Sequence, residues 1–134
     1  MKICIVVSNY YKEISSNLLT GTLNELKKNK YKNINIKIVS GAFEIPNIIS
    51  RNIKKFDAFI ALGCVIKGET DHYYFISQAV STGIMNLSIL YKKPIGFGVL
   101  TCNNLRQAKM RALVSKKNKG KEVASGIISI LKNK

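Results

Sequence analysis

The chain has 134 residues, of which 46% are hydrophobic and 22% charged, with 9 glycines and 2 prolines. This composition predicts one globular domain over residues 1–134 that needs no disulfide or metal, and it excludes a disordered chain and a two-domain protein. The net charge of +15, from 22 Lys plus Arg against 7 Asp plus Glu, raises the question of a nucleic-acid partner.

The first half of the chain alternates between strand and helix patterns. Residues 2–8 form a nearly continuous β-branched apolar run, which predicts a strand buried on both faces. Apolar residues at helical spacing over 14–26 predict a helix. Isoleucine alternates with polar residues over 34–39, which predicts a second strand, and Pro46 marks the first turn of a short helix reaching about Lys54.

The second half repeats the alternation. Residues 57–66 predict a third strand, and a long helix follows over Asp71–Tyr91 with Thr70 as its N-cap. Residues 94–101 predict a fourth strand. Two more helices are predicted over 104–113 and 119–131. Strands alternating with crossover helices predict an α/β fold, a three-layer α/β/α sandwich around a four-stranded parallel sheet, of the flavodoxin-like class.

Most lysines gather where the predicted helices end. The clusters are Lys27, Lys28 and Lys30, then Lys54 and Lys55, Lys92 and Lys93, and finally Lys132 and Lys134. Lysine complements the negative end of a helix dipole, so solvated helix ends explain these clusters. The arginines, which nucleic-acid readout favours, are only Arg51, Arg106 and Arg111. A nucleic-acid partner is therefore not favoured.

The cysteines and the hydropathy indicate the cellular compartment of the protein. Cys4, Cys64 and Cys102 are far apart and form no CxxC pair, so neither a disulfide framework nor a zinc site is predicted. Apolar runs are shorter than the roughly 18 residues of a membrane span, and no signal peptide precedes the first strand. We expect a cytoplasmic protein that carries no metal.

Ligands of open parallel sheets bind beyond the carboxyl ends of the strands. In this chain those segments hold aromatic, acidic and basic side chains, and they are 8–11, 41–44, 67–72 and 97–101. Such a mixture suits a flat, polar heteroaromatic ligand. His72, the only histidine, falls in the first turn of a helix, where a phosphate is favoured and a neutral imidazole can accept a proton. A hydrogen-bonded capping role is the alternative, and Cys64 is expected to be core rather than nucleophile.

Four blocks of sequence closely resemble the signature blocks of one enzyme family, in the same order and with the same spacing. They are GAFEIP at 41–46, ALGCVIKGETDH at 61–72, FGVLT at 97–101 and NKG at 118–120. Over essentially its whole length the chain resembles the 6,7-dimethyl-8-ribityllumazine synthases, which catalyse the penultimate step of riboflavin biosynthesis.

The resemblance implies a transferase that condenses 5-amino-6-(D-ribitylamino)uracil with 3,4-dihydroxy-2-butanone 4-phosphate, without a metal or an organic cofactor. Each step moves protons, and none needs a redox group. By this likeness His72 is the catalytic, proton-transferring residue. Glu69, Thr70 and Arg111 are implied to hold the phosphorylated butanone, the arginine through charge-assisted hydrogen bonds.

The resemblance further implies a pyrimidine pocket and a homo-oligomer. The residues implied to line the pyrimidine side are Tyr10, Ala42, Phe43, Glu44, Cys64, Val65, Ile66 and Phe97. Lys119 and Glu122 match further positions of the family's site. The family builds its sites between subunits of a pentamer, and the residues expected to face an adjacent chain are Phe97, Arg111, Lys119 and Glu122. A pentamer and a shell of pentamers both stay open, although the chain begins at its first strand without the amino-terminal arm of many relatives.

The chain departs from the family pattern at two places. Asn9, Tyr10 and Tyr11 stand where the family usually has Arg, Phe and Asn, which keeps ring stacking but alters the polar contacts. Asp71 replaces the proline that commonly precedes the histidine. Two other functions therefore stay open: the related pentameric riboflavin synthase, and a non-catalytic relative that binds flavin or nucleic acid. The histidine block favours the lumazine synthase.

Overall fold

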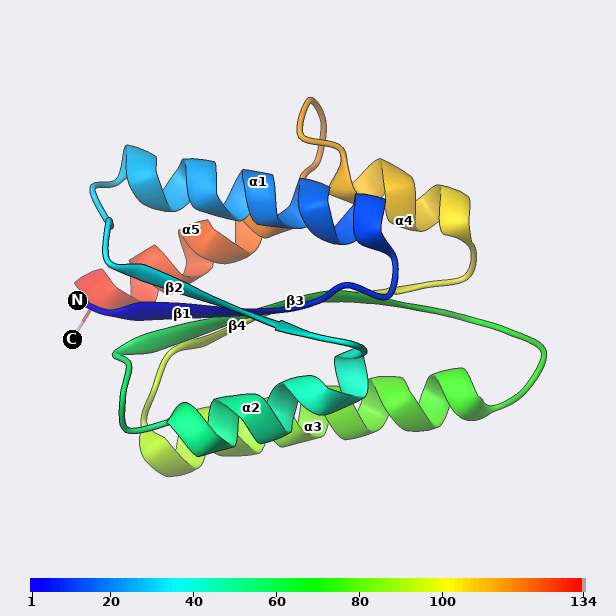
Figure 1. Ribbon diagram of the computed structural model, residues 1–134, viewed down its shortest axis with the longest axis horizontal. Coiled ribbons are helices and arrows are strands. Elements are labelled where there is room, and N and C mark those ends of the chain that lie inside the picture. Colours follow the sequence, from blue (N-terminus) through cyan, green and yellow to red (C-terminus); the bar gives the residue numbers. More distant parts are fainter. Residues whose placement is uncertain (134) are drawn as a thin grey trace.

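Four parallel strands form the centre of the protein, which confirms the predicted four-stranded parallel sheet, and they lie in the order β2-β1-β3-β4 (Figure 1). A computed structural model describes residues 1–133. The strands are β1 (Ile3–Ser8), β2 (Ile34–Val39), β3 (Ala58–Ile66) and β4 (Ile95–Cys102). Because β1 and β3 lie inside the sheet and β2 and β4 at its edges, the carboxyl ends of β1 and β3 meet at the middle of one sheet border.

Helices cover both faces of the sheet, which gives the three predicted layers (Figure 1). One face carries α1 (Lys12–Lys28), α4 (Leu105–Ala112) and α5 (Lys119–Lys132). The other carries the short 3-10 turn η1 (Ala42–Glu44), α2 (Ile45–Asn52) and α3 (His72–Tyr91). No helix within residues 1–133 is both long enough and apolar enough to cross a membrane.

The alternation of side chains along β1 shows why the sheet needs helices on both faces. Ile3, Ile5 and Val7 belong to the core beneath α1, α4 and α5, whereas Cys4 and Val6 belong to the core beneath α2 and α3. Successive side chains of a strand point to opposite faces, so a continuous apolar run contributes side chains to both cores. This confirms the predicted burial of the first strand on both faces.

The helix starts agree with the prediction except at α3. Its N-cap is Asp71 rather than Thr70, so that prediction was wrong by one residue. The Thr70 hydroxyl instead accepts a hydrogen bond from the His72 backbone N–H at 3.3 Å, before the helix begins. At α4 the cap is Asn104, whose side chain accepts from the Gln107 N–H at 2.9 Å. Side-chain caps of this kind satisfy donors that the first turn leaves unpaired.

The lysine clusters do follow helix ends. Lys27 and Lys28 lie in the last turn of α1, and Lys132 lies in the last turn of α5. Lys92 is the C-cap of α3 with a left-handed φ of 53°. In this topology helices run antiparallel to the strands, so their carboxyl ends lie at the border opposite the strand carboxyl ends. The clusters therefore lie away from the expected ligand border.

Candidate active site

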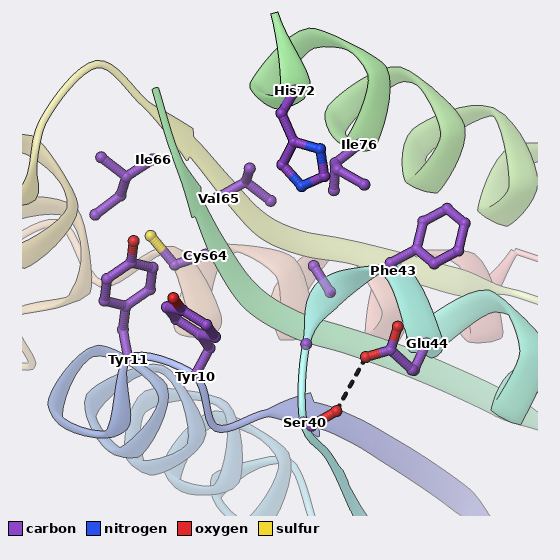
Figure 2. Close-up of a pocket in the computed structure, with 12 residues that line it drawn as sticks. Tyr10, Tyr11, Ser40, Phe43, Glu44, Cys64, Val65, Ile66, His72 and Ile76 are labelled. Carbon is purple, nitrogen blue, oxygen red and sulfur yellow. Dashed lines mark hydrogen bonds between the residues drawn. The ribbon is translucent and has the colours of Figure 1, made fainter. Parts of the chain in front are cut away.

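A cavity of about 500 Å³ opens at the carboxyl ends of β1, β2 and β3 and at the first turn of α3 (Figure 2). We call it the main cavity. Eight predicted site residues line it: Tyr10, Ala42, Phe43, Glu44, Cys64, Val65, Ile66 and His72. These residues, which the resemblance implied for one site, therefore surround one cavity, because parallel strands bring their carboxyl ends to one border of the sheet.

Aromatic rings form two opposite sides of the main cavity. Tyr10 and Tyr11 follow β1 and contact each other edge to face, with ring centroids 4.9 Å apart. Phe43 lies across the opening with His72 and Ile76 (Figure 2). Tyr10 is 73% exposed and Phe43 is 60% exposed, which is unusual for large apolar rings. Exposed ring faces of this kind are suited to stacking on a flat ligand.

The carboxylate of Glu44 is held at the wall of the main cavity by its own turn. Ser40 Oγ donates a hydrogen bond to Glu44 Oε1 at 3.0 Å (Figure 2). Gly41 permits this approach, since a Cβ at that position would lie 3.1 Å from the same oxygen. Glu44 therefore presents an oriented acceptor beside the aromatic walls.

Cys64 lines the main cavity but is not a nucleophile. Its side chain belongs to the core beneath α1, and burial, helped by nearby Cys102, raises the pKa of the thiol to about 12. Only a thiolate attacks efficiently, and this thiol stays protonated near neutral pH. The segment from Cys64 to Ile66 thus contributes strand-end backbone and small apolar groups to the wall.

His72 projects into the main cavity from the first turn of α3 (Figure 2). The loop before it contains Glu69 and Thr70, which are exposed and lie outside the cavity lining. Lys67 ties the loop to the sheet, because its backbone N–H donates to the Cys102 carbonyl at 2.9 Å. Its ammonium lies 5.5 Å from the centre of the Tyr74 ring, a cation–π contact that spans the loop.

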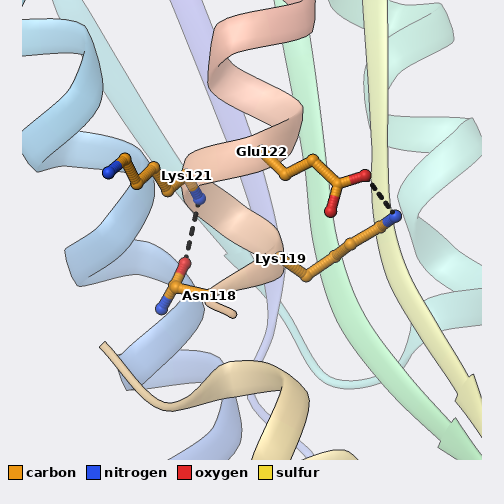
Figure 3. Close-up of polar contacts among 4 residues, drawn as sticks. All are labelled: Asn118, Lys119, Lys121 and Glu122. Carbon is orange, nitrogen blue, oxygen red and sulfur yellow. Dashed lines mark hydrogen bonds and ion pairs between the residues drawn. The ribbon is translucent and has the colours of Figure 1, made fainter. Parts of the chain in front are cut away.

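Four of the six remaining predicted residues line a second cavity of about 360 Å³, and the other two, Glu69 and Thr70, line neither cavity. The lining of the second cavity comes from β4, the end of α4 and the start of α5, and includes Phe97, Arg111, Lys117, Lys119 and Glu122. Lys119 Nζ lies 3.1 Å from Glu122 Oε1 (Figure 3). Arg111 Nη1 donates to Cys102 Sγ at 3.3 Å. With more cationic than acidic groups, this second cavity is suited to a phosphate.

Within residues 1–133 each cavity has its own set of lining residues, so one chain does not bring His72 together with Phe97, Arg111 or Lys119. The reason is topological. The main cavity is built on β1, β2 and β3, whereas the second cavity lies on β4, an edge strand that pairs only with β3.

Two residues of the main cavity, Ser40 and Ile76, lie outside the segments predicted to bind a ligand, and two more, Tyr11 and Gly41, lie within those segments but were not among the predicted site residues. A signal existed for some of them. Ile76 is four residues after His72, the spacing that places two side chains on the same face of a helix. Gly41 begins the GAFEIP block, and Ser40 directly precedes it. Among residues 1–133, no group of three or more His, Cys, Asp or Glu side chains is arranged to hold a metal ion.

The fold and the main cavity define an α/β protein that binds a small molecule at the carboxyl border of a parallel sheet. The chain belongs to the 6,7-dimethyl-8-ribityllumazine synthase family, whose model matches residues 1–134. It is 47% identical over 128 residues to the 6,7-dimethyl-8-ribityllumazine synthase of Buchnera aphidicola subsp. Baizongia pistaciae, covering 91% of this chain and 80% of that protein. It is 38% identical over 132 residues to the synthase of Limosilactobacillus reuteri, covering 97% of this chain and 87% of the relative. The resemblance seen in the sequence is thus confirmed.

Proposed function

We propose that this protein is an enzyme that condenses 5-amino-6-(D-ribitylamino)uracil with 3,4-dihydroxy-2-butanone 4-phosphate to form 6,7-dimethyl-8-ribityllumazine. The observation that carries the proposal is the position of His72. The only histidine of the chain opens onto a cavity with exposed aromatic walls, at the border where parallel sheets bind ligands. Membership of the synthase family supplies the reaction that this arrangement serves.

The pyrimidine is proposed to bind between the aromatic sides of the main cavity. Tyr10 and Phe43 offer ring faces for stacking, and the backbone around Val65 offers hydrogen bonds to the edge of a uracil. The oriented carboxylate of Glu44 accepts hydrogen bonds from the ribityl hydroxyls or the ring N–H groups. Ala42 and Ile66 complete the apolar lining.

The phosphorylated butanone is proposed to bind near the start of α3. A helix N-terminus presents unpaired N–H groups and the positive end of a dipole, which both favour a phosphate. Glu69 and Thr70 lie in the loop that leads into this helix. Arg111 supplies a planar guanidinium that can hold two phosphate oxygens at once.

His72 is proposed to move protons between the two substrates. An amine of the uracil adds to the ketone and loses water to give an imine, and phosphate is then eliminated to leave an enol that becomes a new ketone. The second amine attacks this ketone and loses a second water, which closes the ring. Each of these steps needs a proton delivered or removed beside the reacting atoms, and a positioned imidazole does both. Holding the two substrates side by side in one cavity supplies the remaining acceleration.

The active site is further proposed to form between two copies of the chain in a homopentamer or a multiple of it. The separation of the two cavities supports this, because the cationic residues around Arg111 would then complete the main cavity of a neighbour. Large apolar side chains left on the surface of α3 also support assembly: Phe75 is 71% exposed, Ile89 68% and Leu90 72%. We also propose a cytoplasmic location, which fits three buried, unpaired cysteines.

The test mixes the purified protein with both substrates and follows lumazine formation, with the spontaneous reaction as the blank. We expect wild-type turnover, and a rate about 100-fold lower for His72→Ala, the size of effect typical of losing a general acid or base. Tyr73→Phe is the matched control, since this neighbour in the same helical turn lies outside the cavity lining.

The alternatives predict different results. Equal rates for wild type and His72→Ala would keep the enzyme but remove the proton-transfer role, leaving the alignment of the substrates as the source of rate. A wild-type rate no better than the blank, in a correctly assembled protein, would overturn the assignment. Formation of riboflavin from lumazine alone would instead favour the function of the related riboflavin synthase.

A further inference from the structure

Asn118 joins three helices through one buried amide. It is the N-cap of α5, and its Oδ1 accepts from the Lys121 backbone N–H at 2.9 Å (Figure 3). Its Nδ2 donates to the carbonyl of Asn17 in α1 at 2.9 Å and to the carbonyl of Ala112 at the end of α4 at 2.8 Å. The residue is only 5% exposed, so both amide donors and the amide oxygen are used inside the protein.

Two glycines in the surrounding helices leave room for the Asn118 amide. A Cβ at Gly21 of α1 would lie 2.0 Å from Asn118 Oδ1, and a Cβ at Gly120 of α5 would lie 2.2 Å from the Leu18 carbonyl oxygen. Glycine at both positions therefore lets α1 and α5 touch through their backbones with the Asn118 side chain between them. Such an arrangement leaves the amide little room to move.

A helix cap alone does not require these contacts. Capping needs only the side-chain oxygen, which Asp and Ser supply as well as Asn. The two donated hydrogen bonds instead fix where α5 starts relative to α1 and to the last turn of α4. Arg111 directly precedes Ala112, and Lys119 directly follows Asn118, so the amide ties together the backbones that carry two of the three cations of the second cavity.

We propose that Asn118 is a positioning residue for the phosphorylated substrate, because its amide sets the spacing between Arg111 and Lys119. The inference rests on the proposed function and adds to it a residue that does not line either cavity. Phosphate recognition by two cations depends on where their charges lie, since charge-assisted hydrogen bonds are sensitive to distance and direction.

The substitution Asn118→Asp separates positioning from capping. Aspartate keeps the acceptor for Lys121 and adds a negative charge that is favourable at a helix N-terminus. It loses both donors and places an acceptor against the carbonyls of Asn17 and Ala112. If Asn118 were only a cap, the change would leave substrate binding intact. Asn118→Ser is the milder second variant, because it keeps a capping oxygen, loses both donors and adds no charge.

Asn29→Asp is the matched control. The Asn29 amide likewise donates to a helix carbonyl, that of Glu25 at 2.9 Å, and it lies at the opposite end of α1 from the second cavity. All four proteins are compared as assembled enzymes, with folding checked by circular dichroism and assembly by sedimentation. Steady-state rates are measured with each substrate varied in turn, and inorganic phosphate is tested as an inhibitor.

We expect Asn118→Asp to raise KM for the butanone phosphate and the inhibition constant of inorganic phosphate about tenfold, because displacement of Arg111 or Lys119 weakens their charge-assisted hydrogen bonds to phosphate. Asn118→Ser should shift both in the same direction by less. The KM for the uracil, and all constants of Asn29→Asp, should change by less than about twofold, since those contacts do not depend on the α4–α5 spacing.

Two results would overturn the inference. An active wild type whose Asn118 variants leave both phosphate-dependent constants unchanged, or raise the KM values of both substrates equally, would reduce Asn118 to a helix cap. Variants that lose only thermal stability would likewise reduce it to a cap. An inactive wild type would instead overturn the proposed function, and with it this inference, before any variant is compared.

Discussion

Cys4 and Cys64 show what burial does to a single ionisable group in this protein. Cys4 is fully buried in β1, and burial, partly offset by Lys37, raises the pKa of its thiol from 9.0 to about 11. In β3 the pKa of Cys64 rises to about 12. Both residues therefore serve as small apolar groups in the two cores, and neither supplies a thiolate near neutral pH.

These shifts predict a loss of stability in alkali. Below pH 9 the thiols are protonated in both states, whereas above pH 9 the unfolded chain releases protons that the folded chain retains. Stability should therefore fall as the pH rises from 9 toward about 11 for Cys4 and about 12 for Cys64. The measurement is urea unfolding from pH 8 to about 10.5 under reducing conditions, at one protein concentration.

The double variant Cys4→Ala, Cys64→Ala is the comparison. Below pH 9 it should be less stable than wild type by an amount that does not depend on pH, because the lost packing is neutral. Its stability should also fall less steeply above pH 9. If the free energy of unfolding depended on pH in the same way for the two proteins, these thiols would ionise as readily in the folded state as in the unfolded state. That result would refute the prediction.

Secondary-structure elements were predicted well where the cause is local. The first strand was predicted over 2–8 and is observed over Ile3–Ser8, because a buried apolar run is visible in the sequence. A helix was also predicted over 104–113, and α4 is observed over Leu105–Ala112 with Asn104 as its cap. The α3 cap was misplaced by one residue because Thr70 and Asp71 are adjacent and both are common capping residues, and Asp71 makes no side-chain capping hydrogen bond.

Contacts between distant segments could not be predicted in this way. The hydrogen bond from Asn118 to Asn17 joins residues 101 positions apart, and no periodicity in either segment reveals it. The same distinction between local and long-range causes applies to the candidate site. Residues after β1 and β2 and at the end of β3 line one cavity, whereas the separate location of Phe97 depends on β4 being an edge strand.

The packing of α5 predicts opposite effects for two glycines of the same helix. A Cβ at Gly120 would lie 2.2 Å from the Leu18 carbonyl oxygen and 2.6 Å from Thr22 Oγ1, whereas a Cβ at Gly126 would meet nothing within 4 Å. Gly120→Ala should destabilise the protein by about 2 to 3 kcal/mol through overpacking. Gly126→Ala should stabilise it by about 0.5 to 1 kcal/mol, because alanine loses less backbone entropy in a helix.

Urea unfolding of the two variants beside wild type measures both effects, and each variant controls for the other. They make the same chemical change in one helix and differ only in what surrounds the new methyl group. A Gly120→Ala protein as stable as wild type would mean that α1 and α5 separate easily. That result would contradict the tight contact on which the Asn118 inference also depends.

At the scale of the whole molecule, the main feature is that a single chain carries two separate cavities, the proposed halves of one shared site. The main cavity holds the aromatic walls and His72, and the second cavity holds the cations, on different borders of the sheet. A closed ring in which each copy offers one surface to the next brings unlike surfaces together at every interface. A pentamer of this kind would complete one active site for each pair of neighbours.

This arrangement predicts that two inactive variants restore each other. His72→Ala damages only the main cavity, and Arg111→Ala damages only the second cavity. When the two variants are co-expressed in equal amounts, one interface in four pairs two undamaged halves, so about a quarter of the wild-type rate should return. The control pair, His72→Ala with Glu44→Ala, damages the main cavity of every copy and should recover nothing. If the first mixture instead showed a rate no higher than the sum of the rates of the two separate variants, neighbouring chains would not share an active site. That result would refute the proposal.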